Sequence, residues 1–71
     1  MDYKVLDVFR IGNNTSVTIE GKGNGLKNNM RIKDSLGITH KLLSVAMISG
    51  DNRDTTTLLI EGDFNSKVVR V

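Results

Sequence analysis

This sequence predicts an all-β fold, a small closed or partly open antiparallel β-barrel of about six short strands. Val, Ile and Thr account for 19 of the 71 residues, whereas alanine occurs once and proline is absent. β-Branched side chains suit the pleated surface of a sheet and are stiff in helices. Glycine and asparagine, seven of each, fall in clusters between the β-rich stretches and supply the backbone freedom of tight turns. We therefore expect short strands joined by turns.

The first two strands are expected to form a hairpin. Residues 3–11 are β-rich, Gly12-Asn13-Asn14 supplies a turn, and residues 16–20 alternate between polar and apolar side chains. The odd-numbered side chains of the first strand would share one face, but Asp7 interrupts that face and apolar residues also lie opposite. A β-bulge or a half-covered outer face is expected there.

The later strands follow turns of the same kind. Residues 21–25 are too rich in glycine to remain in a ladder. The further strands that the pattern predicts are residues 30–33, 38–49, 55–61 and 67–71. Within them, residues 41–48 form an apolar run that also fits a helix capped by Gly50, and the strand is the preferred interpretation. No repeat or linker divides the sequence, so we expect a single β-barrel domain over residues 1–71.

The expected core consists of apolar side chains at alternating or central positions of these strands. They are Val5, Phe9, Val17, Ile19, Ile32, Val45, Met47, Leu58 and Ile60. The aromatic side chains are Tyr3, Phe9 and Phe64, whereas barrels that bind single strands present several aromatic rings as stacking platforms. The sequence therefore disfavours a cold-shock-like role.

Composition excludes several kinds of site. No cysteine is present and His40 is the single histidine, which excludes a disulfide framework, a thiolate metal site and a multi-histidine metal site. No apolar run approaches the roughly 20 residues that cross a bilayer, and residues 1–4 lack the apolar stretch of a signal peptide. We expect a cytoplasmic protein with no cofactor and no membrane association.

Two patterns that resemble sites are interpreted as structural. Residues 21–25 have the composition of a glycine-rich phosphate loop, but no helix is expected after Gly25, so a hairpin turn is preferred. His40 has no second histidine and no serine or acid at a motif spacing, so we expect it to pack or to lie on the surface.

The acidic residues offer no clear chemistry either. Asp51, Asn52 and Asp54 could supply oxygen ligands, but their loop lacks the other positions of an EF-hand. Glu61 and Asp63 are the closest carboxylate pair near a strand end, and nothing gives them divergent environments as an acid and a base. We do not expect an enzyme.

The positive charge is concentrated in one segment. The formal net charge of the chain is +2, but residues 22–41 hold five cations, Lys22, Lys27, Arg31, Lys33 and Lys41, against one acid. Arg31 and Lys33 are two residues apart on an expected strand, so both project from one face. Lys22, Lys27, Arg31 and Lys33 are therefore the candidate nucleic-acid-binding residues. The alternative is that they form the solvated outer face that protects a barrel strand.

Several short motifs occur in order along nearly the whole chain. Residues 7–11 read Asp-Val-Phe-Arg-Ile and precede the turn Gly12-Asn13-Asn14-Thr15; residues 25–32 contain Leu-Lys before an alternating strand. Residues 41–47 read Lys-Leu-Leu-Ser-Val-Ala-Met, and residues 57–62 read Thr-Leu-Leu-Ile-Glu-Gly. Together these motifs resemble the β-barrel domain that follows the GTPase domain in elongation factor Tu and its translation-factor relatives. No Walker A motif is present, so we expect a stand-alone barrel.

The resemblance implies a barrel that contacts RNA. In elongation factor Tu the first strand and turn help to hold the aminoacyl end of tRNA, and this chain has Asn13 where the family has an arginine. We therefore expect contact with RNA or a ribonucleoprotein to run through the basic segment. The alternative is a structural or regulatory protein–protein interaction domain that self-associates or docks a partner through an uncovered strand edge. Salt distinguishes them, because polyanion binding weakens steeply with salt and apolar docking does not.

Overall fold

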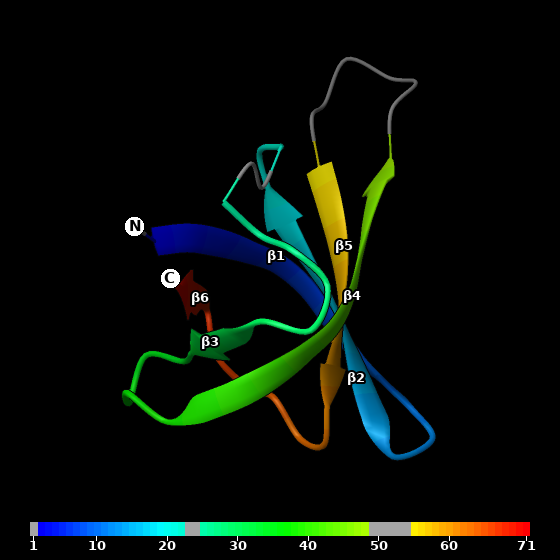
Figure 1. Cartoon of the computed structure of the whole chain (residues 1–71), viewed down its shortest axis with the longest axis vertical. Helices are drawn as coiled ribbons and strands as arrows, with labels where there is room; N and C mark the ends of the chain where they lie inside the picture. The colour runs from blue at the N-terminus through cyan, green and yellow to red at the C-terminus, as the bar shows by residue number, and fades with distance from the viewer. Residues whose placement is uncertain (1, 23–24, 49–54) are drawn as a thin grey trace.

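The computed structural model describes residues 2–22, 25–48 and 55–71, with the backbone alone for the last two residues of the middle range. In the described residues the fold is all-β and contains no helix (Figure 1). The six strands are β1 (Asp2–Ile11), β2 (Asn14–Glu20), β3 (Arg31–Lys33), β4 (Thr39–Ile48), β5 (Thr55–Glu61) and β6 (Val68–Arg70).

The strands close into an antiparallel barrel with the order β1-β2-β5-β4-β3-β6, so the predicted fold class is confirmed. The two ten-residue strands, β1 and β4, each pair with two neighbouring strands. The start of β1 pairs with β6 and the rest pairs with β2. In the same way, β4 pairs first with β3 and then with β5. The two strands bend across the barrel in Figure 1, and the ambiguous stretch 41–48 is strand throughout.

Irregularities in the ladders lie where the long strands change partners. The register of β1 shifts between Val5 and Asp7, which confirms the expected bulge, and that of β4 shifts between Leu42 and Ser44. The β1–β2 hairpin turns through two residues, of which Gly12 has a φ of 59° and Asn13 does not enter the positive-φ region. This is the pattern of a type II′ turn, which needs glycine at its first central position.

Nine apolar side chains form the buried core. They are Val17, Ile19, Leu26, Ile32, Leu42, Leu58, Ile60, Phe64 and Val69. Five of the nine expected core residues are among them, whereas Val5 and Val45 are partly buried against the cluster. The side chain of Met47 lies outside the described residues.

The prediction that Phe9 belongs to the core is wrong. Its side chain is 53% exposed, whereas Val8 is half-buried and packs on the core cluster. The bulge inserts one extra residue between Val5 and Asp7, and one extra residue moves every following side chain to the opposite face. Phe9 therefore stands on the outer face of the barrel, opposite Ser16 of β2.

Candidate nucleic-acid interface

The outer face of β3 carries two of the candidate cations. Ile32 is 1% exposed and points into the barrel, whereas Arg31 and Lys33 on either side of it are exposed. This confirms that the two-residue spacing places both cations on one face. It also fixes the face as the outside of the barrel, because the side chain between them belongs to the core.

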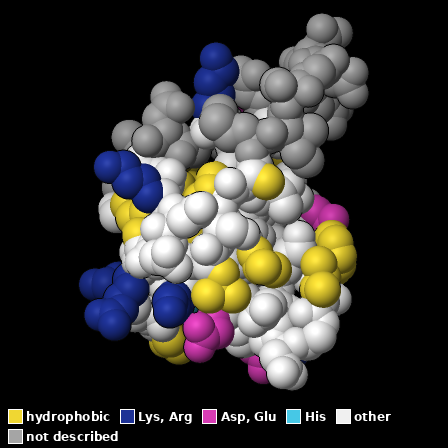
Figure 2. Space-filling view, turned by 45° about the vertical axis from the view of Figure 1, so that its right-hand side comes forward, with side chains coloured by type: hydrophobic (Ala, Val, Ile, Leu, Met, Phe, Trp, Pro, Cys, Tyr) yellow, Lys and Arg dark blue, Asp and Glu magenta, His cyan; other side chains and the backbone are white. Residues whose placement is uncertain are grey.

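The neighbouring strands add cations directly opposite these two. In the β3–β4 ladder Arg31 lies opposite Lys41, and in the β3–β6 ladder Lys33 lies opposite Arg70. All four side chains are exposed. We call this group, Arg31, Lys33, Lys41 and Arg70, the basic face. Figure 2 shows Lys and Arg side chains in dark blue along the left-hand side of the molecule.

Few acids neutralise the basic face. The Arg70 guanidinium Nε lies 3.5 Å from a carboxylate oxygen of Asp2, and both side chains are about half exposed. Within the described ranges, Arg31, Lys33 and Lys41 form no ion pair. Like charges directly opposite each other on a sheet destabilise the pair. The basic face therefore carries repulsion that a bound anion would relieve.

The other two candidate cations lie elsewhere. Lys22 follows Gly21, whose carbonyl accepts a hydrogen bond of 2.8 Å from the Thr56 hydroxyl near the start of β5. Thr56 pairs with residue 47 of β4, six residues beyond Lys41. At about 3.3 Å per residue of strand, Lys22 is therefore roughly 20 Å from the basic face along the barrel.

Lys27 occupies an intermediate position. It lies in the connection between β2 and β3, where the next residue, Asn28, accepts a hydrogen bond of 2.8 Å from the Val45 amide through its side-chain oxygen. Asn29, the residue after that, donates its amide to the Leu42 carbonyl at 2.9 Å. The connection thus runs along β4. It carries Lys27 as an exposed cation between Lys22 and the basic face.

A buried acid holds the turn of the β3–β4 hairpin. Asp34 is 7% exposed, and one of its carboxylate oxygens accepts the amides of Leu36 and Ile38 at 2.9 and 3.0 Å. The other oxygen lies 2.8 Å from Nε2 of His40. The His40 ring in turn packs edge-on against Phe64, with ring centroids 4.9 Å apart. These contacts fix the hairpin that presents three cations of the basic face.

The sequence missed this pairing of Asp34 with His40. His40 was expected to pack or to lie on the surface, and it does pack, because it lies opposite Ile32 on the inner side of the hairpin. The available signal was the turn Asp34-Ser35-Leu36-Gly37, in which an aspartate side chain caps the following amides. An inward-facing residue three positions after Gly37 then comes within reach of the same carboxylate.

The Asp34–His40 contact predicts a pH dependence of stability. The hydrogen bond from His40 is the largest cause and lowers the pKa of the Asp34 carboxyl. Burial, the next largest, opposes it, but with the backbone amides of Ile38 and Leu36 also lowering the pKa, the net shift is below the ordinary value of 3.8. A depressed pKa in the folded state stabilises the fold above the unfolded pKa, and this contribution is lost as the pH falls through the folded pKa. We expect the urea concentration at the denaturation midpoint to decrease once the pH falls below about 4, the ordinary pKa range of an aspartate.

The measurement is urea denaturation from pH 6 to pH 2 for the wild type and for Asp34→Asn. The variant should be less stable at pH 6 and should show a shallower acid decline. Asp2→Asn is the matched control for the loss of one negative charge. Parallel acid declines in wild type and Asp34→Asn would contradict the assignment.

Two of the remaining acidic candidates, Glu61 and Asp63, lie in the described residues. Asp63 forms an ion pair with Arg10, and Glu61 is exposed at the end of β5. Asp51, Asn52 and Asp54 lie outside the described residues. Over the described ranges, no three His, Asp or Glu side chains gather as metal ligands, and no helix is long and apolar enough to cross a membrane.

Comparison with known proteins gives no relative: no family model, no curated protein and no solved structure matches the chain. The assignment of function therefore rests on the residues and their geometry.

Proposed function

We propose that the chain is a binding module, not an enzyme, and that it contacts RNA or a ribonucleoprotein through the basic face. The observation that carries this proposal is the register of like charges, Arg31 opposite Lys41 and Lys33 opposite Arg70. A solvated protective face would gain stability from alternating signs, because opposite charges across a ladder attract and like charges repel. The arrangement favours a ligand that supplies the missing negative charge, and closely spaced phosphates do so.

The proposed contacts are made with phosphates and not with bases. The three aromatic rings lie away from the basic face: Phe64 is 3% exposed, Tyr3 is half-buried against the core, and Phe9 lies over the β1–β2 pair. Without stacking rings, binding should depend on charge and vary little with sequence. Lys27 and Lys22 extend the positive potential along the barrel and attract the polyanion at longer range.

We also propose kinship with the translation-factor barrels, supported by the shared fold class and by the position of the Asp-Val-Phe-Arg-Ile motif in β1. The contact surface differs from that of the family. Asn13 replaces the arginine of the first turn, and Arg10 is engaged by Asp63 and by the Gly12 carbonyl, 3.1 Å from its Nε. RNA contact through the basic face is therefore the version of the family role that these residues support.

The test is a titration of fluorescein-labelled 12-nucleotide oligo(U) and oligo(A) with the protein, followed by anisotropy at salt concentrations from 25 to about 200 mM. We expect similar affinity for both oligonucleotides and a steep salt dependence. Arg31→Glu/Lys33→Glu should weaken binding at least tenfold at low salt. It should also reduce the slope of log affinity against log salt by about 1.4, since each lost phosphate contact removes about 0.7 for a single strand.

The matched control is Lys22→Glu/Lys27→Glu, which changes the net charge by the same amount. This variant should weaken binding less than threefold and keep most of the salt slope. Equal losses in both double variants would show that net charge and not the basic face governs binding. If the unmodified protein binds neither oligonucleotide at low salt, the nucleic-acid proposal fails.

One observation favours the second function, protein–protein interaction. Residues 6–11 of β1 pair with β2 on one side, and no described strand pairs with their other side, so this part of β1 has the uncovered edge through which a partner could dock.

A further inference from the structure

The barrel has an opening where β1 leaves β6. The β1–β6 ladder covers residues Asp2 to Lys4 of β1, and the Val5 amide then donates a hydrogen bond of 2.9 Å to the Lys67 carbonyl. Beyond the bulge, β1 pairs with β2 on one side, and no described strand pairs with its other side. Six residues of β1, 6–11, therefore have an uncovered edge.

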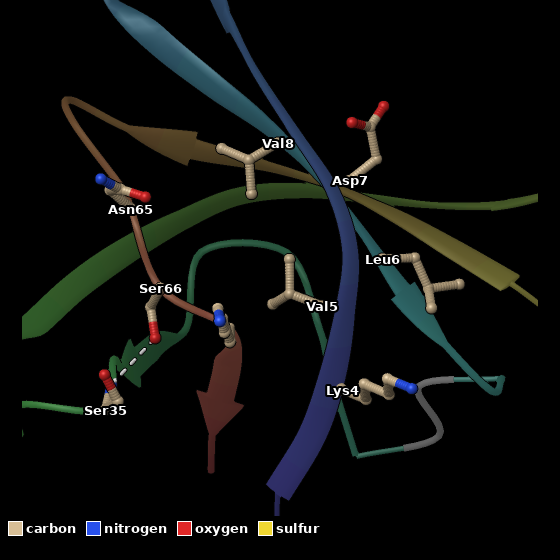
Figure 3. Close-up of a pocket in the computed structure, with 9 residues that line it drawn as sticks. Lys4, Val5, Leu6, Asp7, Val8, Ser35, Asn65 and Ser66 are labelled. Atoms are coloured by element: carbon tan, nitrogen blue, oxygen red, sulfur yellow. Dashed lines mark hydrogen bonds between the residues drawn. The ribbon is translucent and has the colours of Figure 1, made fainter.

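A groove of about 750 Å³ lies at the start of this edge, where residues 4–8 of β1 line it. Figure 3 shows Val5 and Val8 pointing from β1 across the groove toward the segment that carries Asn65 and Ser66, whereas Leu6 and Asp7 lie on the other side of the β1 ribbon. Ser66 is fixed in this second wall, because its hydroxyl accepts the Ser35 amide at 3.1 Å and donates to the Val68 carbonyl at 2.9 Å. The groove thus has one wall formed by β1, which contributes Val5 and Val8, and a second wall that carries Asn65 and Ser66.

The uncovered edge presents backbone groups to the groove. The two-residue turn makes Ile11 and Asn14 the closing pair of the β1–β2 hairpin, and backbone groups alternate along an antiparallel ladder. The N–H and C=O groups of Phe9 therefore face β2. Those of Val8 face the groove, and those of Arg10 point to the same unpaired side of β1, beyond the residues that line the groove. No backbone hydrogen bond across the groove joins them to the described residues. Such groups form a template for one more strand.

The side chains of the uncovered edge give it limited protection. Natural edges are protected by lysine, proline or charged side chains that deter pairing. Residues 6–11 contain no lysine or proline, and of their two charged side chains, Asp7 and Arg10, the second is paired with Asp63. Leu6, Phe9 and Ile11 are 46%, 53% and 50% exposed. These three account for half of the six large apolar side chains that are exposed in the described residues. A strand added here would cover them by cross-strand packing.

We propose that the groove binds an extended peptide segment of a partner protein, which adds to β1 as a strand between β1 and the segment 63–67. The peptide presents alternate apolar side chains, one set to Val5 and Val8 and the other to Phe9. A single extended strand is the occupant that fits, because the second wall stands opposite β1 and blocks the approach of another folded sheet. A second copy of this barrel is therefore disfavoured.

The charges of the groove specify one further feature of the peptide. Asp7 lies on the far side of the β1 ribbon, whereas Lys67 lies in the second wall and forms no ion pair within the described part of the chain. The side-chain amide of Asn65, also in the second wall, makes no hydrogen bond with the described residues. It can therefore bind the peptide backbone. We expect a carboxylate of the peptide to lie against Lys67. This proposal is independent of the proposed RNA contact, because it uses none of the cations of the basic face.

The experiment begins with the selection of a phage-displayed library of random heptapeptides against the immobilised full chain. Selected peptides are then synthesised and titrated into ¹⁵N-labelled protein. We expect alternating apolar residues with at least one Asp or Glu in the selected sequences. At saturation, amide exchange at Val8 and Arg10 should slow at least tenfold, while the Phe9 amide, already paired with β2, should change less than twofold.

Charge exchange tests the assigned contact with Lys67. Lys67→Glu should weaken the binding of an acidic selected peptide at least fivefold. It should strengthen the binding of the same peptide with its acid replaced by lysine. Lys41→Glu, an exposed cation on the basic face, is the matched control and should leave both affinities within twofold. Failure of the charge exchange would refute the assigned carboxylate contact.

Two outcomes overturn the peptide proposal. The first is a selection that enriches no peptide, or enriches peptides whose binding leaves Val8 and Arg10 unprotected. The second is protection of these two amides without peptide that rises with protein concentration together with a dimer in sedimentation velocity, which would assign the edge to a second copy of the chain.

Discussion

Truncation of Leu58 to alanine is expected to lower the free energy of unfolding by about 2 to 5 kcal/mol. Leu58 is fully buried at the centre of β5, with Val17 of β2 and Val45 of β4 as its two register neighbours. Both flanking strands are fixed by the ladder, so the space left by the removed atoms cannot close without shifting the sheet. A 71-residue domain buries a small core and has a free energy of unfolding at the low end of the range of about 5 to 15 kcal/mol. We therefore expect a substantial unfolded population.

The measurement is chemical denaturation at 25 °C followed by circular dichroism, with Phe9→Ala as the control. Phe9 is a larger side chain, but half of it is already in water in the folded state. Truncation of Phe9 should lower the free energy of unfolding by less than about 1 kcal/mol, since surface substitutions have small effects. If Phe9→Ala destabilises the protein as much as Leu58→Ala, the assignment of Phe9 to the outer face is wrong.

Those two residues also mark how far the sequence predicts this fold. Leu58 lies in a regular strand, where alternation alone identifies the buried face, and the same holds for Val17 and Ile19. The position of a bulge cannot be located by alternation, because the extra residue only becomes visible once a partner strand defines the register. The sequence therefore indicated that β1 was irregular and still assigned Phe9 to the wrong face.

Other core residues were missed because their burial depends on closure. Leu26 and Phe64 lie in connections, and no periodicity marks an apolar residue outside a strand. Val69 is buried because β6 completes the barrel between β1 and β3. These contacts join residues far apart in sequence, which a local pattern does not contain.

The candidate interface shows the same division. The two-residue spacing of Arg31 and Lys33 was sufficient to place them on one face. The opposition of Lys33 and Arg70 follows from the pairing of β3 with β6 and was not accessible. Charge counting along the chain also grouped Lys22 with Arg31, although the barrel separates them. A linear window therefore detected a basic segment, whereas the sheet defines the basic face.

The second large effect on stability is expected at a polar residue, Thr15. Its side chain is 2% exposed, and its hydroxyl donates to the Gly62 carbonyl at 2.6 Å and accepts the Phe64 amide at 3.2 Å. These two bonds tie the connection between β5 and β6 to β2 and hold Phe64 in the core, in contact with His40. Valine has nearly the same shape without the hydroxyl. Thr15→Val therefore leaves the buried Phe64 amide and the part-buried Gly62 carbonyl without this partner, at about 1 to 3 kcal/mol for a buried group and less for a part-buried one.

We expect Thr15→Val to lower the free energy of unfolding by about 2 to 4 kcal/mol, on the same unsatisfied-group scale. The denaturation midpoint and the NMR shift of the Phe64 amide measure it. Thr15→Ser retains the hydroxyl and should recover more than half of the loss. Thr57→Val is the matched control, because Thr57 is half-buried on the outer face of β5 and its hydroxyl makes no side-chain hydrogen bond with the described residues. A Thr15→Val variant as stable as Thr57→Val, with the Phe64 amide shift unchanged, would show that these hydrogen bonds do not hold the connection.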